Sequence, residues 1–301
     1  MCTVDLPSWL KNHIYYDLGA VFSPDPLGAR YNADNSHAQN LKYLGTYFPR
    51  SYSEIQHVVN KVETVTSYYR ICSQPSVIRI ISVGCGTGGD IIGMIMALHS
   101  INPQASFSVV IVDTNQDALD ICRGILNFVS QRIGIEINIE AEELANISSK
   151  DALEKLACGY SDFNYVITSK YLNEVLIKMP NPYGVFAESF RRCLADDGLM
   201  IMVDVACKTD PQYGDDYIPK VMNRQIGKIT AAGCDFSTML PRTCGKCSAH
   251  SCENCGLTYT MYESYYSTIE NGKETTRTSK FTYQVIADNN LRDRITFTRL
   301  W

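Results

Sequence analysis

The sequence predicts an α/β protein with a parallel sheet. Between residues 76 and 206, short apolar segments alternate with segments of helical periodicity, which is typical of parallel strands joined by helical crossovers. The chain has 301 residues, of which 45% are hydrophobic, so it can bury a large core. We expect strands at 77–83, 106–112, 135–139, 163–168 and 199–205, and helices at 89–101, 115–133 and 182–195. These units in series indicate a Rossmann-like core over residues 76–206.

We expect residues 1–75 to form an N-terminal helical segment. Its clearest helix covers 51–65, where apolar residues recur at helical spacing. Ser51 and Glu54 make a capping box after Pro49, which predicts that the helix begins there.

The composition changes after the predicted core. Residues 207–280 are rich in Cys, Gly, Thr and Tyr and lack regular periodicity, so we expect an insertion. Residues 281–301 predict two strands on either side of a turn at 289–291. Such a C-terminal β-hairpin would complete the sheet.

Charge and hydropathy exclude some classes of function. The formal net charge of -5 argues against binding nucleic acid by bulk electrostatics and leaves a local basic face as the alternative. No apolar run reaches the roughly 20 residues that span a bilayer, and the first residues lack the pattern of a secretory signal. We therefore expect a soluble, cytoplasmic protein without a membrane partner.

A glycine-rich turn follows the first predicted strand. The segment VGCGTGGD contains Gly84, Gly86 and Gly88, and glycines there allow a sharp turn and bring bare backbone N–H groups against a ligand. Asp113 ends the second strand about 25 residues later, near the spacing at which an acid accepts hydrogen bonds from a ribose. The pair predicts a site for an adenosine cofactor, either a dinucleotide or S-adenosylmethionine.

Two details favour S-adenosylmethionine over a dinucleotide. Asp90 opens the helix after the turn, where an acid repels a pyrophosphate but suits a sulfonium or an amino group. The turn also lacks the third glycine at the spacing of the dinucleotide fingerprint.

At these motifs the chain resembles the class I S-adenosylmethionine-dependent methyltransferases. VGCGTGGD is similar to their first motif and VDTN to their second, whereas Ser82 stands where the family usually has an acidic residue. The resemblance implies a Rossmann-like methyltransferase fold. It implies that the cofactor-binding residues include Gly84, Cys85, Gly86, Gly88, Asp113 and Thr114.

The same resemblance assigns roles to residues after the later strands. Glu142 or Glu143, in the segment EAEEL after the third strand, would lie beside the adenine. The segment ITSKYLNEVL after the fourth strand would line the methyl-transfer site through Ser169, Lys170, Tyr171, Asn173 and Glu174. Among these, Ser169 and Tyr171 are expected to bind the cofactor. We expect Glu174 or Asp204 to act as the catalytic residue on the methyl acceptor.

Several segments are also similar to one branch of this superfamily, the methyltransferase-like proteins associated with assembly of the mitochondrial small ribosomal subunit and their bacterial relatives. The similar segments are YLGTYFPRSYSEIQHVVNKV, YVITSKYLNEVL, LMIMVD and KFTYQVI, from about Tyr43 onward. That family places cysteines between its fifth strand and a late strand, where they are thought to hold an iron–sulfur cluster. This chain has VDVACKTD where the family usually has a Glu-Pro-Gly segment. The resemblance implies a substrate that is RNA or is associated with the ribosome.

Four cysteines are clustered in the segment TCGKCSAHSCENC. Cys244, Cys247, Cys252 and Cys255 have the spacing C-x2-C-x4-C-x2-C, and two such pairs can supply four thiolates to tetrahedral zinc. Four thiolates also suit an iron–sulfur cluster, and redox or unligated cysteines are a third alternative. Because four thiolates leave no open position on zinc, we expect a structural metal centre, with zinc as the first choice and an iron–sulfur cluster as the second.

Two hypotheses about function follow. The first is an enzyme that transfers a methyl group from S-adenosylmethionine to an unidentified acceptor, either RNA or protein. After Val205 the charged residues nearly balance, which favours the insertion as the RNA-binding face. The alternative is a catalytically inactive scaffold that binds S-adenosylmethionine, contains a metal, and presents a surface to an RNA or protein partner.

Overall fold

The computed structural model describes residues 4–25, 34–72, 75–176, 179–207, 217–231, 235–241 and 261–298. The chain forms two compact units. The first unit consists of Met1–Asn60, Pro75–Ala145 and Glu263–Ser279, and the second of Lys61–Gln74, Asn146–Tyr262 and Lys280–Trp301. Both units contain parallel strands and helices, so the protein has the mixed α/β fold that a Rossmann-like core requires. None of the helices in these described ranges combines the length and the apolar character needed to cross a bilayer.

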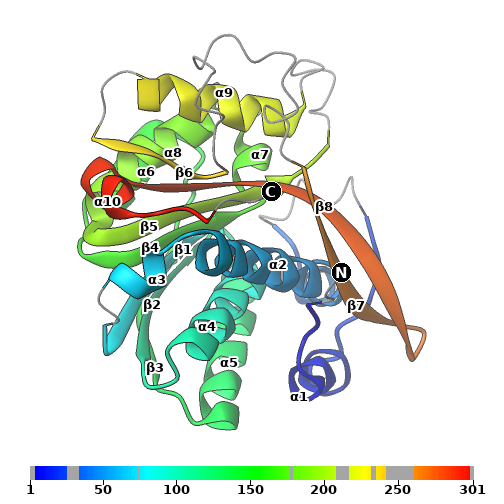
Figure 1. Cartoon of the computed structure of the whole chain (residues 1–301). Helices are drawn as coiled ribbons and strands as arrows, with labels where there is room; N and C mark the ends of the chain where they lie inside the picture. Colours follow the sequence, from blue (N-terminus) through cyan, green and yellow to red (C-terminus); the bar gives the residue numbers. More distant parts are fainter. Residues whose placement is uncertain are drawn as a thin grey trace. The chain divides into compact units, whose positions relative to one another are not determined.

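The parallel sheet of the first unit has the strand order β3-β2-β1 (Figure 1). β1 (Val77–Val83) and β3 (Ile137–Leu144) both pair with β2 (Ser106–Asp113), whose inner residues are all buried. α4 (Gly89–Ile101) follows β1, and α5 (Gln116–Ile133) follows β2. The predicted strands and helices of this region are therefore confirmed. One boundary differs, because β3 runs further than expected and includes the segment EAEEL.

The long helix α2 (His37–Val65) differs from the prediction, which began a helix at Ser51. α2 passes through Pro49, which lacks an N–H and so leaves the carbonyl of Gly45 without its helical donor. The Tyr15 hydroxyl donates to this carbonyl at 2.6 Å and satisfies it from outside the helix. Because the helix continues through the proline, Ser51 lies inside it and the predicted capping box is wrong. Two short helices, α1 (Ser8–Asn12) and the π-helix η1 (His13–Asp17), precede α2.

A β-hairpin begins within residues 207–280, the region that the sequence predicts as an insertion. β7 (Tyr262–Glu270) pairs with β8 (Lys273–Asp288) across a two-residue turn, Asn271 and Gly272, whose φ angles are 50° and 75°. A type I′ hairpin turn needs a positive φ at both central positions, which Asn-Gly readily adopts. The turn end of this hairpin belongs to the first unit, and the later part of β8 belongs to the second.

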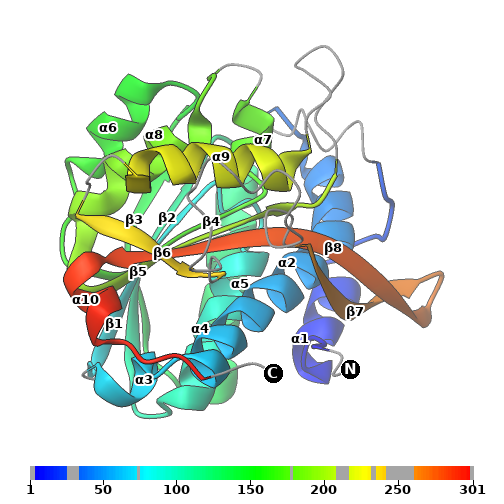
Figure 2. The same ribbon diagram turned by 45° about the horizontal axis from the view of Figure 1, so that its top comes forward.

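The second unit has the strand order β4-β5-β8-β6. β4 (Phe163–Ser169) and β5 (Leu194–Val205) are parallel, whereas β8 pairs antiparallel with both β5 and β6 (Phe236–Leu240). Its helices include α3 (Tyr68–Ile71), α6 (Lys150–Ala157), α7 (Leu172–Val175), α8 (Pro182–Phe190), the 3-10 helix η3 (Arg191–Cys193), α9 (Ile218–Ala231) and α10 (Asn289–Arg294). α8 contacts both α6 and α9 (Figure 2).

The predicted C-terminal hairpin is wrong. α10 takes the place of the expected turn and the start of the second strand. Asp288 caps its N-terminus, because Asp288 Oδ1 accepts the Asn290 N–H at 2.7 Å. Among residues 295–298, the described part of the chain after α10, Phe297 forms a single bridge with Thr66. Within the described residues, β8 therefore finds its partners in β5, β6 and β7.

We predict that Gly45→Ala destabilises the protein. A Cβ added at Gly45 in α2 would lie 2.5 Å from the carbonyl carbon of Val21, a backbone atom that cannot rotate away. We expect the free energy of unfolding to fall by about 1–3 kcal/mol. The matched control is Gly124→Ala in α5, where the added Cβ meets nothing within 4 Å in the described structure. This control should stabilise the protein by about 0.5–1 kcal/mol, because alanine favours a helix. Urea unfolding measures both changes, and equal changes would contradict the close packing at Gly45.

Candidate functional site

The turn after β1 has a backbone that glycine adopts far more readily than other residues. Gly84, Gly86 and Gly88 have φ angles of 72°, 52° and 93°, where a side chain would be strained. The N–H groups of Gly84 and Cys85 both donate to the Val112 carbonyl, at 2.8 and 3.0 Å. The glycine turn is therefore fastened to the end of β2.

Gly86 and Gly88 differ in what surrounds them. A Cβ added at Gly88 would lie 2.6 Å from Cys122 Sγ, so this glycine allows α5 to pack against the turn. At Gly86 an added Cβ would meet Tyr43 Cε1 at 3.4 Å, and no other described atom beyond its chain neighbours within 4 Å. Gly86 therefore presents bare backbone to open space, as a glycine that lies against a ligand must.

Asp113, at the end of β2, lies against this turn. The Gly86 N–H donates to Asp113 Oδ2 at 2.7 Å, and the Asn115 N–H donates to Oδ1 at 3.0 Å. Burial raises the pKa of Asp113, and these backbone N–H groups together with that of Thr114 oppose the rise. A carboxylate has about four lone-pair sites, so both oxygens retain capacity for a further hydrogen bond. The structure thus brings Gly86 and Asp113 together, while their role in binding a cofactor stays a prediction.

Asp90 lies inside the protein and not on the surface of the candidate site. It is 2% exposed, and its Oδ2 accepts the hydroxyl of the fully buried Ser82 at 2.9 Å. Its Oδ1 accepts the Ile91 N–H at 2.7 Å, so the carboxylate satisfies the start of α4. The Asp90 oxygens therefore face these buried donors, and the expectation that Asp90 suits a sulfonium or an amino group stays a prediction.

Cys85, in the middle of the glycine turn, is 5% exposed. Its hydrogen bond with Cys122 and its burial both raise the pKa of the Cys85 thiol. A protonated thiol is a poor nucleophile, so Cys85 acts as a small residue within the turn.

Glu142 lies within β3 and forms an ion pair. Its Oε2 is 2.8 Å from Nη1 of Arg123 on α5, and Arg123 also pairs with Asp120 at 2.6 Å. A ligand beside Glu142 would therefore contact a carboxylate whose charge is offset by Arg123. The predicted contact of Glu142 or Glu143 with an adenine stays a prediction.

Sequence patterns did not predict that α2 contributes to this corner of the first unit. His37 Nδ1 lies 2.8 Å from Asp117 Oδ1. Asn40 Nδ2 donates to Asp117 Oδ2 at 2.8 Å and to Asn115 Oδ1 at 2.9 Å. Asn40 is 2% exposed and shares a helix face with the buried Leu44, so a polar residue on an apolar stripe was the signal that could have revealed it.

In the second unit, Asp204 on β5 organises the turn after β4. Its Oδ2 accepts the Asn173 N–H at 3.1 Å and the Tyr183 hydroxyl at 2.7 Å. Its Oδ1 accepts the Asn173 side-chain amide at 2.6 Å and the Val205 N–H at 2.7 Å. Asp204 is 1% exposed, and burial raises its pKa to about 6 although these donors and Lys170 oppose the rise. The geometry favours a positioning role, and a catalytic role for Asp204 stays a prediction.

The other residues predicted after β4 lie on the same turn. Ser169 ends β4, Tyr171 precedes α7 and Glu174 lies within it. Lys170 has a φ of 61°, and its N–H donates to the Val203 carbonyl at 2.8 Å, which holds the turn against β5. Ser169 Oγ is buried and has no hydrogen-bond partner among the described residues. The cofactor roles of Ser169 and Tyr171 and the catalytic role of Glu174 stay predictions.

The four clustered cysteines, Cys244, Cys247, Cys252 and Cys255, lie outside the described residues. Within the described ranges, no group of three or more His, Cys, Asp or Glu side chains could hold a metal ion. The predicted zinc or iron–sulfur centre therefore stays a prediction.

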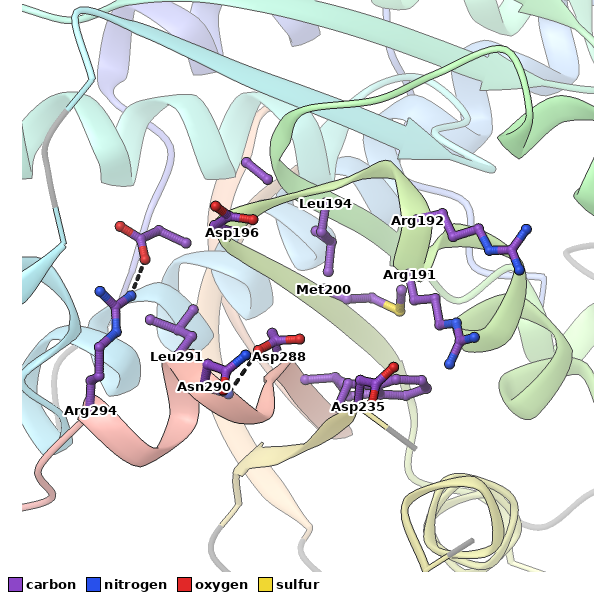
Figure 3. Close-up of a pocket in the computed structure, with 14 residues that line it drawn as sticks. Arg191, Arg192, Leu194, Asp196, Met200, Asp235, Asp288, Asn290, Leu291 and Arg294 are labelled. Carbon is purple, nitrogen blue, oxygen red and sulfur yellow. Dashed lines mark hydrogen bonds and ion pairs between the residues drawn. The ribbon is translucent and has the colours of Figure 1, made fainter. Parts of the chain in front are cut away.

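A cavity of about 780 Å³ lies in the second unit, near the start of β5 (Figure 3). Arg191 and Arg192 line one side, and Asp196 and Asp288 lie elsewhere on its wall. None of the residues predicted from the sequence as site residues lines it. Ligands of open α/β sheets bind at the carboxyl ends of the strands, so the glycine turn is the better candidate site.

Comparisons with protein-family models and with curated proteins found no match. Among solved structures, the chain is similar to class I S-adenosylmethionine-dependent methyltransferases at low sequence identity. A candidate RNA methyltransferase from Pyrococcus horikoshii has 11% identity and a TM-score of 0.40, over 92% of this chain and 98% of that one. A candidate class I methyltransferase from Listeria monocytogenes has 10% identity and a TM-score of 0.41, over 82% of this chain and 62% of that one. The ribosomal protein L11 methylase from Lactobacillus delbrueckii subsp. bulgaricus has 12% identity and a TM-score of 0.39, over 79% of each chain.

We predict that Asp204 makes the protein less stable as the pH rises from about 4 to about 6. The folded state raises the Asp204 pKa from 3.8 to about 6, so it holds the proton more tightly than the unfolded chain does. The stabilisation is complete below the unfolded pKa and is lost as the pH rises through the folded one, with a size of about 3 kcal/mol.

Urea unfolding across this pH range should be measured for the unaltered protein and for Asp204→Asn, which cannot titrate. We expect the unaltered protein to lose stability relative to the variant as the pH rises. Tyr183→Phe removes a donor that lowers the Asp204 pKa. The stability of this variant should therefore continue to fall at higher pH than that of the unaltered protein. A difference between the unaltered protein and Asp204→Asn that does not change with pH would contradict this prediction.

Proposed function

We propose that this protein is a methyltransferase that uses S-adenosylmethionine. The observation that carries the proposal is the open backbone of Gly86 beside the Asp113 carboxylate, at the carboxyl ends of β1 and β2. An aspartate at that position can accept hydrogen bonds from both ribose hydroxyls, and a bare glycine lets the rest of the cofactor approach the chain. In this proposal Asp113 holds the ribose, and the turn from Gly84 to Gly88 lies against the remainder of the cofactor.

The start of α4 supports S-adenosylmethionine over a dinucleotide. A pyrophosphate binds where the first N–H groups of a helix are free and the helix dipole is positive. Here Asp90 accepts the Ile91 N–H and places a carboxylate at the start of α4. The negative charge of Asp90 offsets the positive end of the α4 dipole and repels a phosphate. The site therefore suits a cofactor without a phosphate group.

The proposed reaction requires mainly that the methyl donor and the acceptor are aligned. S-adenosylmethionine supplies a methyl group on a sulfonium, and an in-line displacement moves it to a nucleophile on the acceptor. Asp113 and the glycine turn would orient the donor, and Glu174 would take a proton where the acceptor must lose one. Asp204 would position the turn after β4 through Asn173. The acceptor in this proposal is RNA or a protein.

A second candidate function is a cofactor-binding scaffold without turnover. Asp204, one of the two carboxylates predicted to act on an acceptor, is 1% exposed and already accepts four hydrogen bonds. Ser82 stands where the class I methyltransferases that the sequence resembles usually have an acid, and its hydroxyl donates to Asp90. A screen for labelled methyl transfer into RNA and protein fractions separates the two functions, because only the enzyme labels an acceptor.

We predict that Asp113→Ala weakens the binding of S-adenosylmethionine by about 10-fold or more, because two hydrogen bonds to a charged group are lost. Isothermal titration calorimetry measures the dissociation constant. The matched control is Asp120→Ala on α5, which removes an exposed carboxylate that pairs with Arg123 and should bind normally. Absence of binding by the unaltered protein would reject the proposed function. Equal binding by Asp113→Ala would reject only the assignment of this residue.

We also propose that Cys244, Cys247, Cys252 and Cys255 hold one structural metal centre, because four thiolates at this spacing fill the coordination sphere of zinc. Elemental analysis of the purified protein should find about one zinc per chain, or iron with sulfide if the centre is an iron–sulfur cluster. The metal should be lost in Cys247→Ser and retained in Cys158→Ser, a change at an exposed cysteine elsewhere in the chain. A metal-free, folded protein purified without oxygen would contradict the proposal.

A further inference from the structure

We propose that Tyr43 forms part of the cofactor site and gives it a preference for the positively charged sulfonium over the neutral thioether left after methyl transfer. This inference rests on the proposed function and deepens it. It assigns to α2 a binding role that neither the motifs nor the comparisons assign.

The Tyr43 ring lies beside Gly86. A Cβ added at Gly86 would lie 3.4 Å from Tyr43 Cε1 and would meet no other described atom beyond its neighbours within 4 Å. The Tyr43 ring therefore borders the open side of Gly86. Tyr43 is half-buried, so part of its surface is available to a ligand.

The turn of α2 that precedes Tyr43 is hydrogen-bonded to the residues that hold Asp113. Asn40 lies about one turn before Tyr43 on α2 and donates to Asn115 Oδ1 at 2.9 Å. The Asn115 N–H in turn donates to Asp113 Oδ1 at 3.0 Å, and the Gly86 N–H donates to Asp113 Oδ2 at 2.7 Å. Hydrogen bonds therefore run from Asn40 through Asn115 and Asp113 to Gly86, which Tyr43 borders. Tyr43, Gly86 and Asp113 thus form one connected wall.

Neighbouring groups also restrict the ring. Tyr47, one turn later on α2, packs against Tyr43 with ring centroids 4.8 Å apart and an angle of 48° between the rings. The Tyr47 hydroxyl donates to the Asp25 carbonyl at 3.2 Å, which fixes the second ring. A ring that is already ordered loses little conformational freedom when a ligand binds.

The positive charge of S-adenosylmethionine lies close to its ribose. In S-adenosylmethionine the sulfonium is attached to the 5′ carbon of the ribose, so a ribose held by Asp113 places the charge within reach of Gly86 and the ring beside it. An aromatic ring attracts a cation through its quadrupole, and such contacts change affinity by about 2- to 30-fold. The product S-adenosylhomocysteine is a neutral thioether and gains nothing from this attraction. Tyr43 therefore favours the methyl donor over the spent cofactor.

The test compares the two ligands in three variants. Isothermal titration calorimetry should give dissociation constants for S-adenosylmethionine and for S-adenosylhomocysteine with Tyr43→Phe, Tyr43→Leu and Tyr43→Met. We expect Tyr43→Phe to keep the preference of the unaltered protein. Tyr43→Leu and Tyr43→Met lack the ring, so they should lose about 2- to 30-fold of the preference, mainly through weaker binding of the charged ligand. Tyr16→Leu, a change at a tyrosine that is 62% exposed, is the matched control and should change neither constant.

The ratio of the two constants distinguishes a binding role from a structural one. If a substitution merely disturbs the fold, the fraction of competent protein falls and both constants rise by the same factor, so the ratio stays the same. An unchanged ratio in both Tyr43→Leu and Tyr43→Met would overturn this inference and leave the proposed function intact. Failure of the unaltered protein to bind either ligand would overturn both.

Discussion

The left-handed backbone of Gly84, Gly86 and Gly88 is the constraint on which the candidate site depends. It turns the chain at the end of β1 so sharply that the N–H groups of Gly84 and Cys85 reach one carbonyl at the end of β2. The next N–H, that of Gly86, then reaches the Asp113 carboxylate. A residue with a side chain at any of the three positions would be strained and would open this junction. The fold and the candidate site therefore both require glycine at these three positions.

The packing of α2 against α4 also requires glycines. A Cβ added at Gly89 would lie 2.7 Å from the Phe48 carbonyl oxygen, and one added at Gly93 would lie 2.8 Å from that of Tyr52. Two glycines on α4 thus let the backbone of α2 lie directly against it. The approach carries the earlier turns of α2 to the start of α5, where the buried Asn40 secures them. A helix outside the glycine motif thereby becomes a wall of the candidate site.

Elements that depend on local signals were predictable from the sequence, and elements that depend on distant partners were not. β1, β2, α4 and α5 follow from apolar periodicity and from glycines at their ends. The start of α2 does not, because the helix passes through Pro49 and the carbonyl that this proline leaves open is satisfied by the hydroxyl of Tyr15, which is remote in sequence. The hairpin turn at Asn271 and Gly272 carried a local signal, but the polar composition around it obscured the strands. The spacing predicted that the glycine turn and Asp113 lie in one site, whereas the hydrogen bond between Gly86 and Asp113 and the contact with Tyr43 required the tertiary structure.

The donors around each buried carboxylate indicate what that carboxylate is for. Glu54 receives Arg50 and Ser279, and Asp90 receives the Ser82 hydroxyl, so side chains of the same unit occupy these acids. The described donors to Asp113 are all backbone N–H groups. Backbone donors fix the orientation of a carboxylate without adding a neutralising charge, so its negative charge and remaining lone pairs stay available. A ribose diol is a neutral group with two donors, and it matches an acid held in this way.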